Sequence, residues 1–431
     1  MSALLQHAAR RLFFSSLGKL QDGYLELVCP DETHTFGDPT SKLRAMAVIH
    51  EQRFFVRAIT GADLGMGESF MDGDWTSPDL VSLVRLAVRN MRLLDSGHPL
   101  VSSLSGFLSR MRHRLHANSL RGSRNNIHHH YDLGNDFYAL FLDQRMLYSC
   151  GLFLGENDSL ETAQLHKLDL ICRKLQLQPG DRVLEIGCGW GGFAVYAAQH
   201  YGVHVTGLTL SPAQHKFATR LVNESSFPTG SVRILLEDYR KISGLYDKIV
   251  SIEMFEAVGV KRYDEFFGAC DRLLTPDGTM MLQTITLLDQ ELASYRKRVD
   301  WIQTYIFPGS ELASLAEIHR SLARRTRISL IQMENFGLHY ANTLAGWRER
   351  FFHNLEQVQH LGFDARFQRM WDFYLAWCEG AFLERYINVA QILLAKNGTQ
   401  RPLYRDPTKV ASPLAPSARV GSLSRQRGMA F

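Results

Sequence analysis

The chain has 431 residues, of which 45% are hydrophobic and 21% are charged, the proportions of a folded globular protein with room for more than one domain. No apolar run approaches the ~20 residues that a membrane-spanning helix requires, so any membrane contact is expected to be peripheral. The six cysteines include no C-x-x-C pair, which argues against a disulfide framework or a metal site and indicates a reduced, cytoplasmic protein.

The formal net charge of +4 is concentrated in two stretches. Residues 401–431 hold six basic side chains against a single acid, Asp406, and residues 110–124 hold five arginines and no acid. Such runs fit weak binding to an anionic membrane surface, at about 1 kcal/mol per basic residue. Neither lies in a recognisable nucleic-acid module, so no nucleic acid is expected as a partner.

The first 124 residues predict a small α+β domain. In chain order we expect an amphipathic helix over 1–20, strands over 23–28, 45–49 and 54–59, and a helix over 80–94. The first helix has basic residues and no acid, which would also suit an organellar transit segment. We favour a helix that packs on the domain, because the pattern is amphipathic.

Residues 125–400 alternate between strands and helices. The expected strands are 182–186, 204–208, 232–236, 248–252 and 279–284, and the expected helices are 165–177, 193–200, 212–223 and 262–274. Nearly continuous apolar strands separated by helices predict a doubly wound parallel α/β sheet. Residues 401–431, with four prolines and no periodicity, are expected to be a disordered tail.

A glycine-rich turn follows the first of these strands. Val183–Gly192 reads V-L-E-I-G-C-G-W-G-G, and glycine permits a ligand to approach the backbone closely before the next helix. A nicotinamide cofactor would need an acid at the end of the second strand, but Gly207–Ser211 contains none. The acid lies inside the turn motif instead, at Glu185. This arrangement resembles the first motif of class I S-adenosylmethionine-dependent methyltransferases.

Five further segments carry a more specific resemblance. They are YDLGNDFY at 131–138, MLYSC at 146–150, MFEAVG at 254–259, NFGLHY at 335–340 and WCEGAF at 377–382. In this order they resemble the cyclopropane-fatty-acyl-phospholipid synthase and mycolic acid cyclopropane synthase family. The resemblance implies a Rossmann-like class I methyltransferase domain preceded by a small lipid-associated domain that forms homodimers.

The resemblance also implies the reaction. A methyl group passes from S-adenosylmethionine to the double bond of an unsaturated phospholipid acyl chain, a base removes a proton, and a cyclopropane ring closes. An alkene is a weak nucleophile, so the donor must be held close and in line, with water excluded.

Residue roles follow from the resemblance position by position. The positions that match the cofactor site are Tyr148, Ser149, Glu185, Gly187, Gly189, Gly191, Thr209, Ser211, Gln214, Asp238 and Tyr239. Cys150, Glu256 and Tyr340 match residues that hold a bicarbonate ion in the family's active site. Cys378 matches a cysteine often assigned to the active site, although methyl transfer to an alkene requires no covalent enzyme adduct; a role lining the acyl tunnel is equally expected.

One position departs from the family pattern. Gln283 stands where many members have a histidine, and Glu253 is an additional carboxylate three residues before Glu256. This departure leaves the product open between a cyclopropane, a methylene or methyl branch, and a furan-fatty-acid precursor. Methylation of a soluble small molecule, or lipid binding without catalysis, are the remaining alternatives. The intact site residues argue against the last.

Two other patterns have structural explanations. His128–His130 are consecutive, so their side chains diverge, and we expect no metal site there. The aromatic residues Phe367, Trp371, Tyr374, Phe382 and Tyr386 recur at helical spacing. Core packing is the default explanation of that face, although an acyl-chain tunnel would use the same residues.

Overall fold

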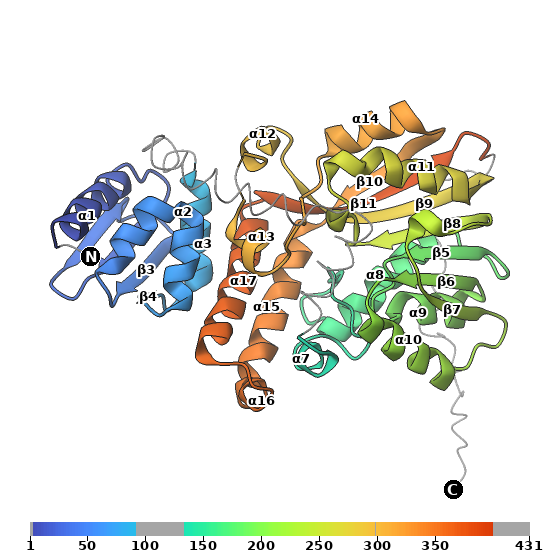
Figure 1. Ribbon diagram of the computed structural model, residues 1–431, viewed down its shortest axis with the longest axis horizontal. Helices are drawn as coiled ribbons and strands as arrows, with labels where there is room; N and C mark the ends of the chain where they lie inside the picture. Colours follow the sequence, from blue (N-terminus) through green and yellow to red (C-terminus); the bar gives the residue numbers. More distant parts are fainter. Residues whose placement is uncertain (1–2, 92–132, 298, 400–431) are drawn as a thin grey trace, which may run out of the picture.

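A computed structural model describes residues 3–91, 133–297 and 299–399. These residues form a small unit around a four-stranded sheet and a large unit around a seven-stranded sheet, which lie at opposite ends of the molecule in Figure 1. The expected boundary at residues 124 and 125, both basic runs, His128–His130 and the expected tail lie outside the described residues.

The small unit packs three helices against its sheet. Its elements are α1 (Ala3–Leu17), β1 (Tyr24–Val28), β2 (Thr33–Gly37), β3 (Arg44–Ile49), α2 (Arg53–Met71), β4 (Trp75–Thr76) and α3 (Leu80–Arg89). The strand order is β2-β1-β3-β4, and β1 and β3 are parallel. The first helix and the strands at 23–28 and 45–49 are confirmed, whereas β2 was not predicted.

The strand predicted at 54–59 is wrong, because this segment is the first turn and a half of α2. Its apolar residues are consecutive rather than alternating, a pattern that fits a buried helix as well as a strand. The rings of Phe54 and Phe55 contact Phe13 of α1 at centroid distances of 5.2 and 5.7 Å. Tertiary packing therefore decides the conformation. The helix is interrupted at Ala62, where φ is 48°.

Helix α3 is shorter than predicted. Asp79 caps its N-terminus by accepting a hydrogen bond from the Ser82 N–H (2.9 Å). Asn90 ends it, since the Asn90 side chain donates to the Leu86 carbonyl (2.9 Å) and accepts from the Gln21 N–H (3.0 Å). The predicted end at Leu94 is therefore wrong.

The large sheet has the order β10-β11-β9-β8-β5-β6-β7. Its strands are β5 (Arg182–Ile186), β6 (His204–Thr209), β7 (Ser231–Leu236), β8 (Tyr246–Ile252), β9 (Leu274–Leu287), β10 (Ile328–Asn335) and β11 (Ile387–Lys396). The five strands predicted from sequence are parallel, which confirms the α/β prediction. β11, not predicted, is antiparallel to both β9 and β10.

Helices cover both faces of this sheet (Figure 1). Helices α8 (Leu160–Lys174) and α9 (Gly192–Tyr201) share a core with Val183 of β5 and Val205 of β6, and α10 (Pro212–Glu224) packs beside them. Helices α11 (Tyr263–Leu273) and α14 (Leu315–Arg325) cover the other face. Helix α8 begins five residues before the predicted start because Ser159 caps it, accepting from the Thr162 N–H.

Two long helices, α15 (Gly337–His353) and α17 (Ala365–Leu383), stand between the small unit and the sheet (Figure 1). The small unit, these helices and α7 (Asn135–Ala139) share one hydrophobic core. Glu384 pairs with Arg85 and Arg89 of α3 at 2.7 Å each. In α2, a Cβ on Gly67 would lie 2.3 Å from Cδ1 of Trp301 in α13 (Trp301–Tyr305), so the close approach requires glycine.

The shorter helices are α12 (Leu292–Tyr295), α16 (Leu355–His360) and three 3₁₀ turns, η1 (Tyr239–Lys241), η2 (Phe255–Ala257) and η3 (Val260–Arg262). Among the described residues, no helix combines the length and the apolar character needed to cross a bilayer.

Candidate functional site

The glycine turn lies at the carboxyl end of β5, beside the position where the chain changes direction across the sheet. Gly187, Gly189 and Gly191 have φ values of 84°, 53° and 89°, which disfavour other residues. A Cβ on Gly187 would lie 2.5 Å from Cγ of Met254, whereas the space next to Gly189 is open. The backbone therefore forms an accessible cradle at the start of α9.

One cavity of about 450 Å³ joins this cradle to the centre of the molecule. Thirteen of the residues predicted from sequence line it: Tyr148, Ser149, Glu185, Gly187, Gly189, Thr209, Gln214, Asp238, Tyr239, Glu253, Glu256, Tyr340 and Cys378. Segments from 148 to 378 thus converge on one site. This convergence is the arrangement that the family resemblance implied.

Four predicted site residues stand behind the cavity wall. Gly191 and Ser211 cap α9 and α10, and Ser211 accepts a hydrogen bond from the Gln214 N–H. Cys150 and Gln283 are fully buried and reach the cavity only through their hydrogen bonds to Glu253.

Glu253, directly after β8, accepts hydrogen bonds from three different chain segments. Its Oε1 accepts from the Cys150 N–H (2.9 Å) and from Nε2 of Gln283 (2.7 Å), and its Oε2 accepts from the Tyr340 hydroxyl (2.6 Å). The backbone of Glu253 is left-handed, with φ of 51°, which costs roughly 1–2 kcal/mol for a residue with a side chain. Burial raises its pKa, and the three donors oppose that rise.

Glu256, three residues further on, is held differently. Its Oε1 accepts from the Ile285 N–H and from the Thr284 hydroxyl, while its buried Oε2 has no hydrogen-bond partner among the described residues. Burial, together with the nearby Glu253 carboxylate, raises the pKa of Glu256 to about 7. This oxygen is thus an unpartnered acceptor on a residue that lines the cavity.

Glu185 of β5 has the same character. Burial raises its pKa to about 8, and its Oε2 also lacks a partner among the described residues. A buried lysine of α8, Lys167, balances the negative charge: its Nζ donates to the Ser149 hydroxyl (2.7 Å), and its positive charge lowers the pKa of Glu185. Sequence reasoning missed Lys167, although a lysine on the apolar face of a helix is a signal for a buried charge.

Tyr148 and Ser149 are held in place by hydrogen bonds that were not predicted. The hydroxyls of Tyr148 and Tyr374 lie 2.8 Å apart, and Nε2 of Gln164 donates to the Ser149 carbonyl at 2.7 Å. Tyr374 belonged to the predicted aromatic face, but its partner lies 226 residues away, which no local pattern reveals.

At the end of β6, neutral amide and hydroxyl groups stand where a nicotinamide enzyme would have an acid. The Thr209 hydroxyl donates to Oε1 of Gln214 at 2.8 Å, which leaves the Gln214 amide N–H groups directed elsewhere. After β7, Asp238 is paired with Arg240 (2.6 Å), an ion pair that helps to lower the Asp238 pKa against the effect of burial. Tyr239 is beside it in the cavity wall.

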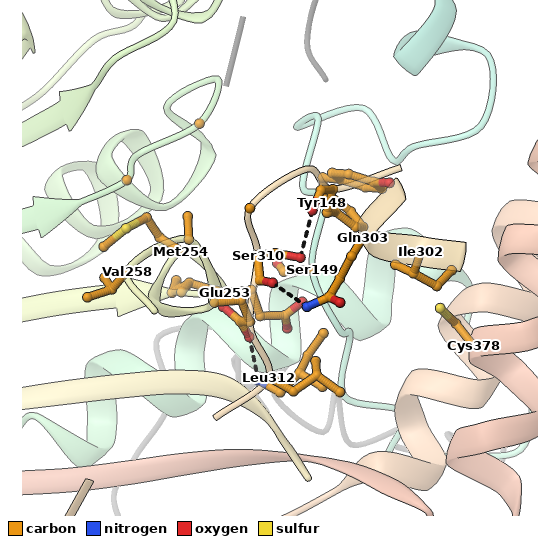
Figure 2. A pocket seen from close by; sticks show the side chains of 18 of the residues that line it. Tyr148, Ser149, Glu253, Met254, Val258, Ile302, Gln303, Ser310, Leu312 and Cys378 are labelled. Atoms are coloured by element: carbon orange, nitrogen blue, oxygen red, sulfur yellow. Dashed lines mark hydrogen bonds between the residues drawn. The ribbon is translucent and has the colours of Figure 1, made fainter. Parts of the chain in front are cut away.

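The other arm of the cavity is mostly apolar and is bounded by α13, α15 and α17, although Asp300 and Gln303 at the start of α13 also line the cavity. Its lining includes Ile302, Phe307, Leu312, Leu344, Trp377, Ala381, Phe382 and Ile387. Figure 2 shows Ile302 and Cys378 on one side of the space and Met254 and Val258 on the other. Burial raises the pKa of the Cys378 thiol well above its usual value, which keeps it protonated and unsuited to act as a nucleophile.

The predicted aromatic face divides between packing and the cavity. Phe367 and Trp371 stack on each other and contact Phe137, so they belong to the core. Tyr374, Phe382 and Tyr386 line the cavity. Tyr386 lies beyond the end of α17, so its assignment to the helix is wrong.

The site thus combines an open glycine cradle, the carboxylates of Glu185, Glu253 and Glu256, and an apolar arm in one cavity. Carboxylates in such a setting attract a cationic ligand and serve as bases. The apolar arm fits a long hydrocarbon chain rather than a small polar substrate.

Comparison with known proteins agrees with this geometry. Residues 118–392 match the family model for mycolic acid cyclopropane synthetase. The chain is 36% identical over 395 residues to tuberculostearic acid methyltransferase of Mycobacterium tuberculosis, covering 87% of this chain and 88% of that protein. It is 38% identical over 344 residues to cyclopropane-fatty-acyl-phospholipid synthase of Escherichia coli, covering 80% and 86%.

Among solved structures, mycolic acid cyclopropane synthase CmaA1 complexed with SAH and CTAB superposes with a TM-score of 0.59 at 36% identity. The match covers 63% of this chain and 98% of that one. The chain therefore belongs to the mycolic acid cyclopropane synthase family and is an S-adenosylmethionine-dependent methyltransferase.

Proposed function

We propose that this enzyme adds the methyl group of S-adenosylmethionine to the double bond of an unsaturated phospholipid acyl chain and closes a cyclopropane ring. One observation carries the proposal: the glycine cradle, the carboxylate of Glu253 and the apolar arm open into a single cavity. A donor in the cradle and a hydrocarbon chain in the arm would meet beside a base. The names of the relatives in Escherichia coli and Mycobacterium tuberculosis also point to fatty acyl substrates.

The cradle fits S-adenosylmethionine by the chemistry of its groups. Open space at Gly189 admits the ligand to the backbone, and the orphan oxygens of Glu185 and Glu256 suit its ammonium and sulfonium charges. Gln214 can donate to ribose hydroxyls, and Asp238 and Tyr239, which line the same cavity, would contact the adenine.

When bound, S-adenosylmethionine supplies an electrophilic methyl group. The π electrons of the alkene form the new C–C bond as the S–CH₃ bond breaks, and the sulfur keeps the electron pair of that bond. The chain then carries a carbocation, which the Glu253 and Glu256 carboxylates stabilise by charge and the neighbouring Tyr340 ring by its electron-rich face. Glu253 removes one proton from the new methyl group, and the ring closes with the electrons of that C–H bond.

Bicarbonate has no place in this scheme. The family resemblance gave Cys150, Glu256 and Tyr340 to a bicarbonate ion, but here the Cys150 N–H and the Tyr340 hydroxyl already donate to Glu253. We therefore assign the role of base to the Glu253 carboxylate, which occupies the donors that would otherwise hold the anion. Gln283 donates to the same carboxylate, as a histidine at this position could donate to a bound anion.

Peripheral membrane binding and a homodimer are part of the same proposal. A phospholipid substrate requires contact with a membrane, and the basic runs at 110–124 and 401–431 would favour an anionic surface. Gel filtration would give the oligomeric state, and co-sedimentation with anionic and neutral vesicles would measure the charge dependence.

The decisive experiment incubates the purified full chain with S-adenosylmethionine and vesicles of monounsaturated phosphatidylglycerol. Gas chromatography–mass spectrometry of the acyl methyl esters is expected to show chains heavier by one CH₂. Vesicles with only saturated chains are the matched control and should stay unchanged. No mass change with the unsaturated lipid, together with methylation of a soluble acceptor, would overturn the lipid substrate.

The name of the Mycobacterium tuberculosis relative favours a second product. Loss of a proton from a neighbouring chain carbon instead of the methyl group would give a methyl-branched alkene. A methylene group would need a hydride shift from the methyl-bearing carbon to the cationic carbon, followed by loss of a methyl proton, with the electrons of that C–H bond forming the double bond. Both are isomers of the ring, so their fragmentation distinguishes them. A saturated methyl branch would be heavier by one carbon and four hydrogens and would need a hydride donor.

A further inference from the structure

A row of polar side chains crosses the hydrophobic sheet and ends at Glu253. The strand registers build it: Glu334 of β10 is paired with Gln391 of β11, Gln391 with Gln283 of β9, and Gln283 with Ile252, the residue before Glu253. Residues paired across neighbouring strands project from the same face of a sheet. Four chain segments therefore place polar groups in one line.

Lys174 at the end of α8 joins this row. Its Nζ donates to Oε2 of Glu334 (2.6 Å) and to Oε1 of Gln391 (2.8 Å). Nε2 of Gln391 donates to Oε1 of Gln283 (3.0 Å), and Nε2 of Gln283 donates to Oε1 of Glu253 (2.7 Å). A continuous relay thus leads from Lys174 to the carboxylate in the cavity.

The chemistry of the ends fixes the direction of the relay. A lysine ammonium can only donate and a carboxylate can only accept, so each glutamine must present its oxygen towards Lys174 and its N–H₂ towards Glu253. If Lys174 did not donate, the Gln391 amide could rotate, and its oxygen would no longer be required to face α8. The orientation of both amides therefore depends on Lys174.

Burial makes the relay expensive to break. The side chain of Lys174 is 2% exposed, and Gln283 and Gln391 are 0% and 1% exposed, whereas Glu334 is 48% exposed at the edge strand. A buried amide without its partner costs about 1–3 kcal/mol, so each link constrains the next. If Lys174 only linked α8 to β10, its ion pair with Glu334 would be sufficient. The hydrogen bonds of the two buried glutamine amides are not needed for that link.

We propose that Lys174 is a positioning residue, which acts through Gln391 and Gln283 to hold the Glu253 carboxylate oriented towards the reacting carbon. The inference rests on the proposed role of Glu253 as the base. Lys174 does not line the cavity, so it contacts neither substrate nor donor.

The relay should control the pH dependence of the reaction. Donation from Gln283 lowers the pKa of Glu253, so loss of that hydrogen bond should raise this pKa and move the acidic limb of the pH–rate profile upward. Other groups also face Glu253 and are left in place: Lys167 of α8, Cys150, Glu256, Tyr340 of α15 and Tyr374 of α17.

The test compares kcat and KM from pH 5 to pH 9 (roughly the range where carboxylates with raised pKa titrate) for the parent, Lys174→Met and Lys174→Gln. For Lys174→Met we expect kcat about tenfold lower, unchanged KM for S-adenosylmethionine, and an acidic limb shifted upward by roughly half to one unit. Lys174→Gln can still donate to Gln391 and should restore most of the shift. Lys248→Met is the matched control, because Lys248 is a buried lysine of β8 that donates to Thr279 outside the relay (3.1 Å).

A double-mutant cycle separates the relay from a loss of stability. In a Gln283→Leu background the relay is already cut, so adding Lys174→Met should shift the acidic limb no further. If Lys174→Met fails to fold, Gln391→Leu gives the same test, since a leucine suits the apolar neighbours of β11. The inference would be overturned if the acidic limb did not move in a folded, active Lys174→Met variant. It would also be overturned if Lys174→Met shifted the limb equally in the parent and in the Gln283→Leu background. A parent enzyme that leaves the lipid unchanged would instead count against the proposed function.

Discussion

The Tyr340 hydroxyl donates to Oε2 of Glu253 at 2.6 Å, and this bond joins α15 to the loop after β8 across the cavity. Tyr340 also stacks on Phe382 with a centroid distance of 4.5 Å. The carboxylate is thus fixed at one oxygen by a tyrosine and at the other by Cys150 and Gln283. A base held by three donors keeps its orientation while a carbocation forms beside it.

Removal of the Glu253 side chain should nearly abolish the reaction, and an added small anion should restore part of it. Glu253→Gly suits the left-handed backbone and frees the donors of Cys150, Gln283 and Tyr340 for a small oxyanion. We expect a fall of about 10²–10⁴ in kcat, the usual contribution of a general base, and partial recovery with bicarbonate or formate.

Glu253→Gln is the matched control for this rescue. Its amide fills the same space, so activity should be lost and the added anions should restore none of it. The parent enzyme should work equally well in bicarbonate-free buffer. A parent that requires bicarbonate would contradict the role assigned to the Glu253 carboxylate.

Gln283→His should reduce the rate mainly at low pH. A neutral imidazole can accept from Gln391 and donate to Glu253, but a protonated one has no acceptor for the Gln391 amide. Because the ordinary histidine pKa is about 6.5, we expect a loss of severalfold near pH 8 and a larger loss near pH 6. Mass spectrometry should find the same product. A changed product would show that this position selects between ring and branch.

The stability of the ligand-free protein should fall as pH rises from about 4.5 to 7. Glu256 has a folded pKa of about 7 against an ordinary value of 4.5, so in this interval the unfolded chain releases its proton while the folded protein retains it. The stabilisation relative to neutral pH is thus fully present below about 4.5 and is lost as pH passes 7. It amounts to at most about 3.5 kcal/mol at about 1.4 kcal/mol per pKa unit.

Glu256→Gln should flatten this dependence in denaturant titrations at several pH values. Glu265→Gln is the control, because Glu265 is a partly exposed residue of α11 that pairs with Arg262. If the free energy of unfolding depended on pH in the same way for the parent and Glu256→Gln, Glu256 would be ionised in the folded protein throughout.

The parallel core of the large sheet was predictable because five strands are continuous apolar runs bounded by helices. β10 and β11 were not predictable. The residues of β10 are mostly exposed and mix polar with apolar side chains, and β11 follows a long helix without a turn signal. The segment at 54–59 was misassigned because only the packing of Phe54 and Phe55 against α1 distinguishes its helix from a strand.

The site also contains residues that the sequence indicated and residues that only the fold reveals. Thirteen residues on the cavity wall stand in or beside motifs that the sequence indicated, whereas others, such as Ile302 and Phe307, lie in no motif. The partners that orient them come from distant segments: Lys174 and Gln391 are 217 residues apart. Neither lies in a motif, and only the strand register brings them into line with Gln283.

Gly187→Ala should weaken S-adenosylmethionine binding. Its Cβ would lie 2.5 Å from Cγ of Met254, and a φ of 84° is strained for alanine. We expect Kd to rise at least about tenfold in calorimetry, because the cradle must shift to relieve the contact. Gly268→Ala on α11 is the control, since a Cβ there has open space, and its Kd should equal the parent's. An unchanged Kd for Gly187→Ala would place the donor elsewhere.

Cys378 should matter for the size of the apolar arm and not for its chemistry. The thiol lines the cavity, and burial raises its pKa, so Cys378→Ser should keep kcat within about twofold of the parent. Cys378→Phe adds a ring opposite Met254 and Val258 and should raise the KM for the lipid or shorten the acyl chains accepted, with S-adenosylmethionine affinity unchanged (Figure 2). Chromatography of products from phospholipids with chains of different length would measure this preference.

The buried Cys270 of α11 lies outside the cavity, so Cys270→Ser controls for general destabilisation. Loss of activity in Cys378→Ser alone would point to a chemical role for the thiol, and an unaltered chain-length profile in Cys378→Phe would place the acyl chain in another part of the cavity.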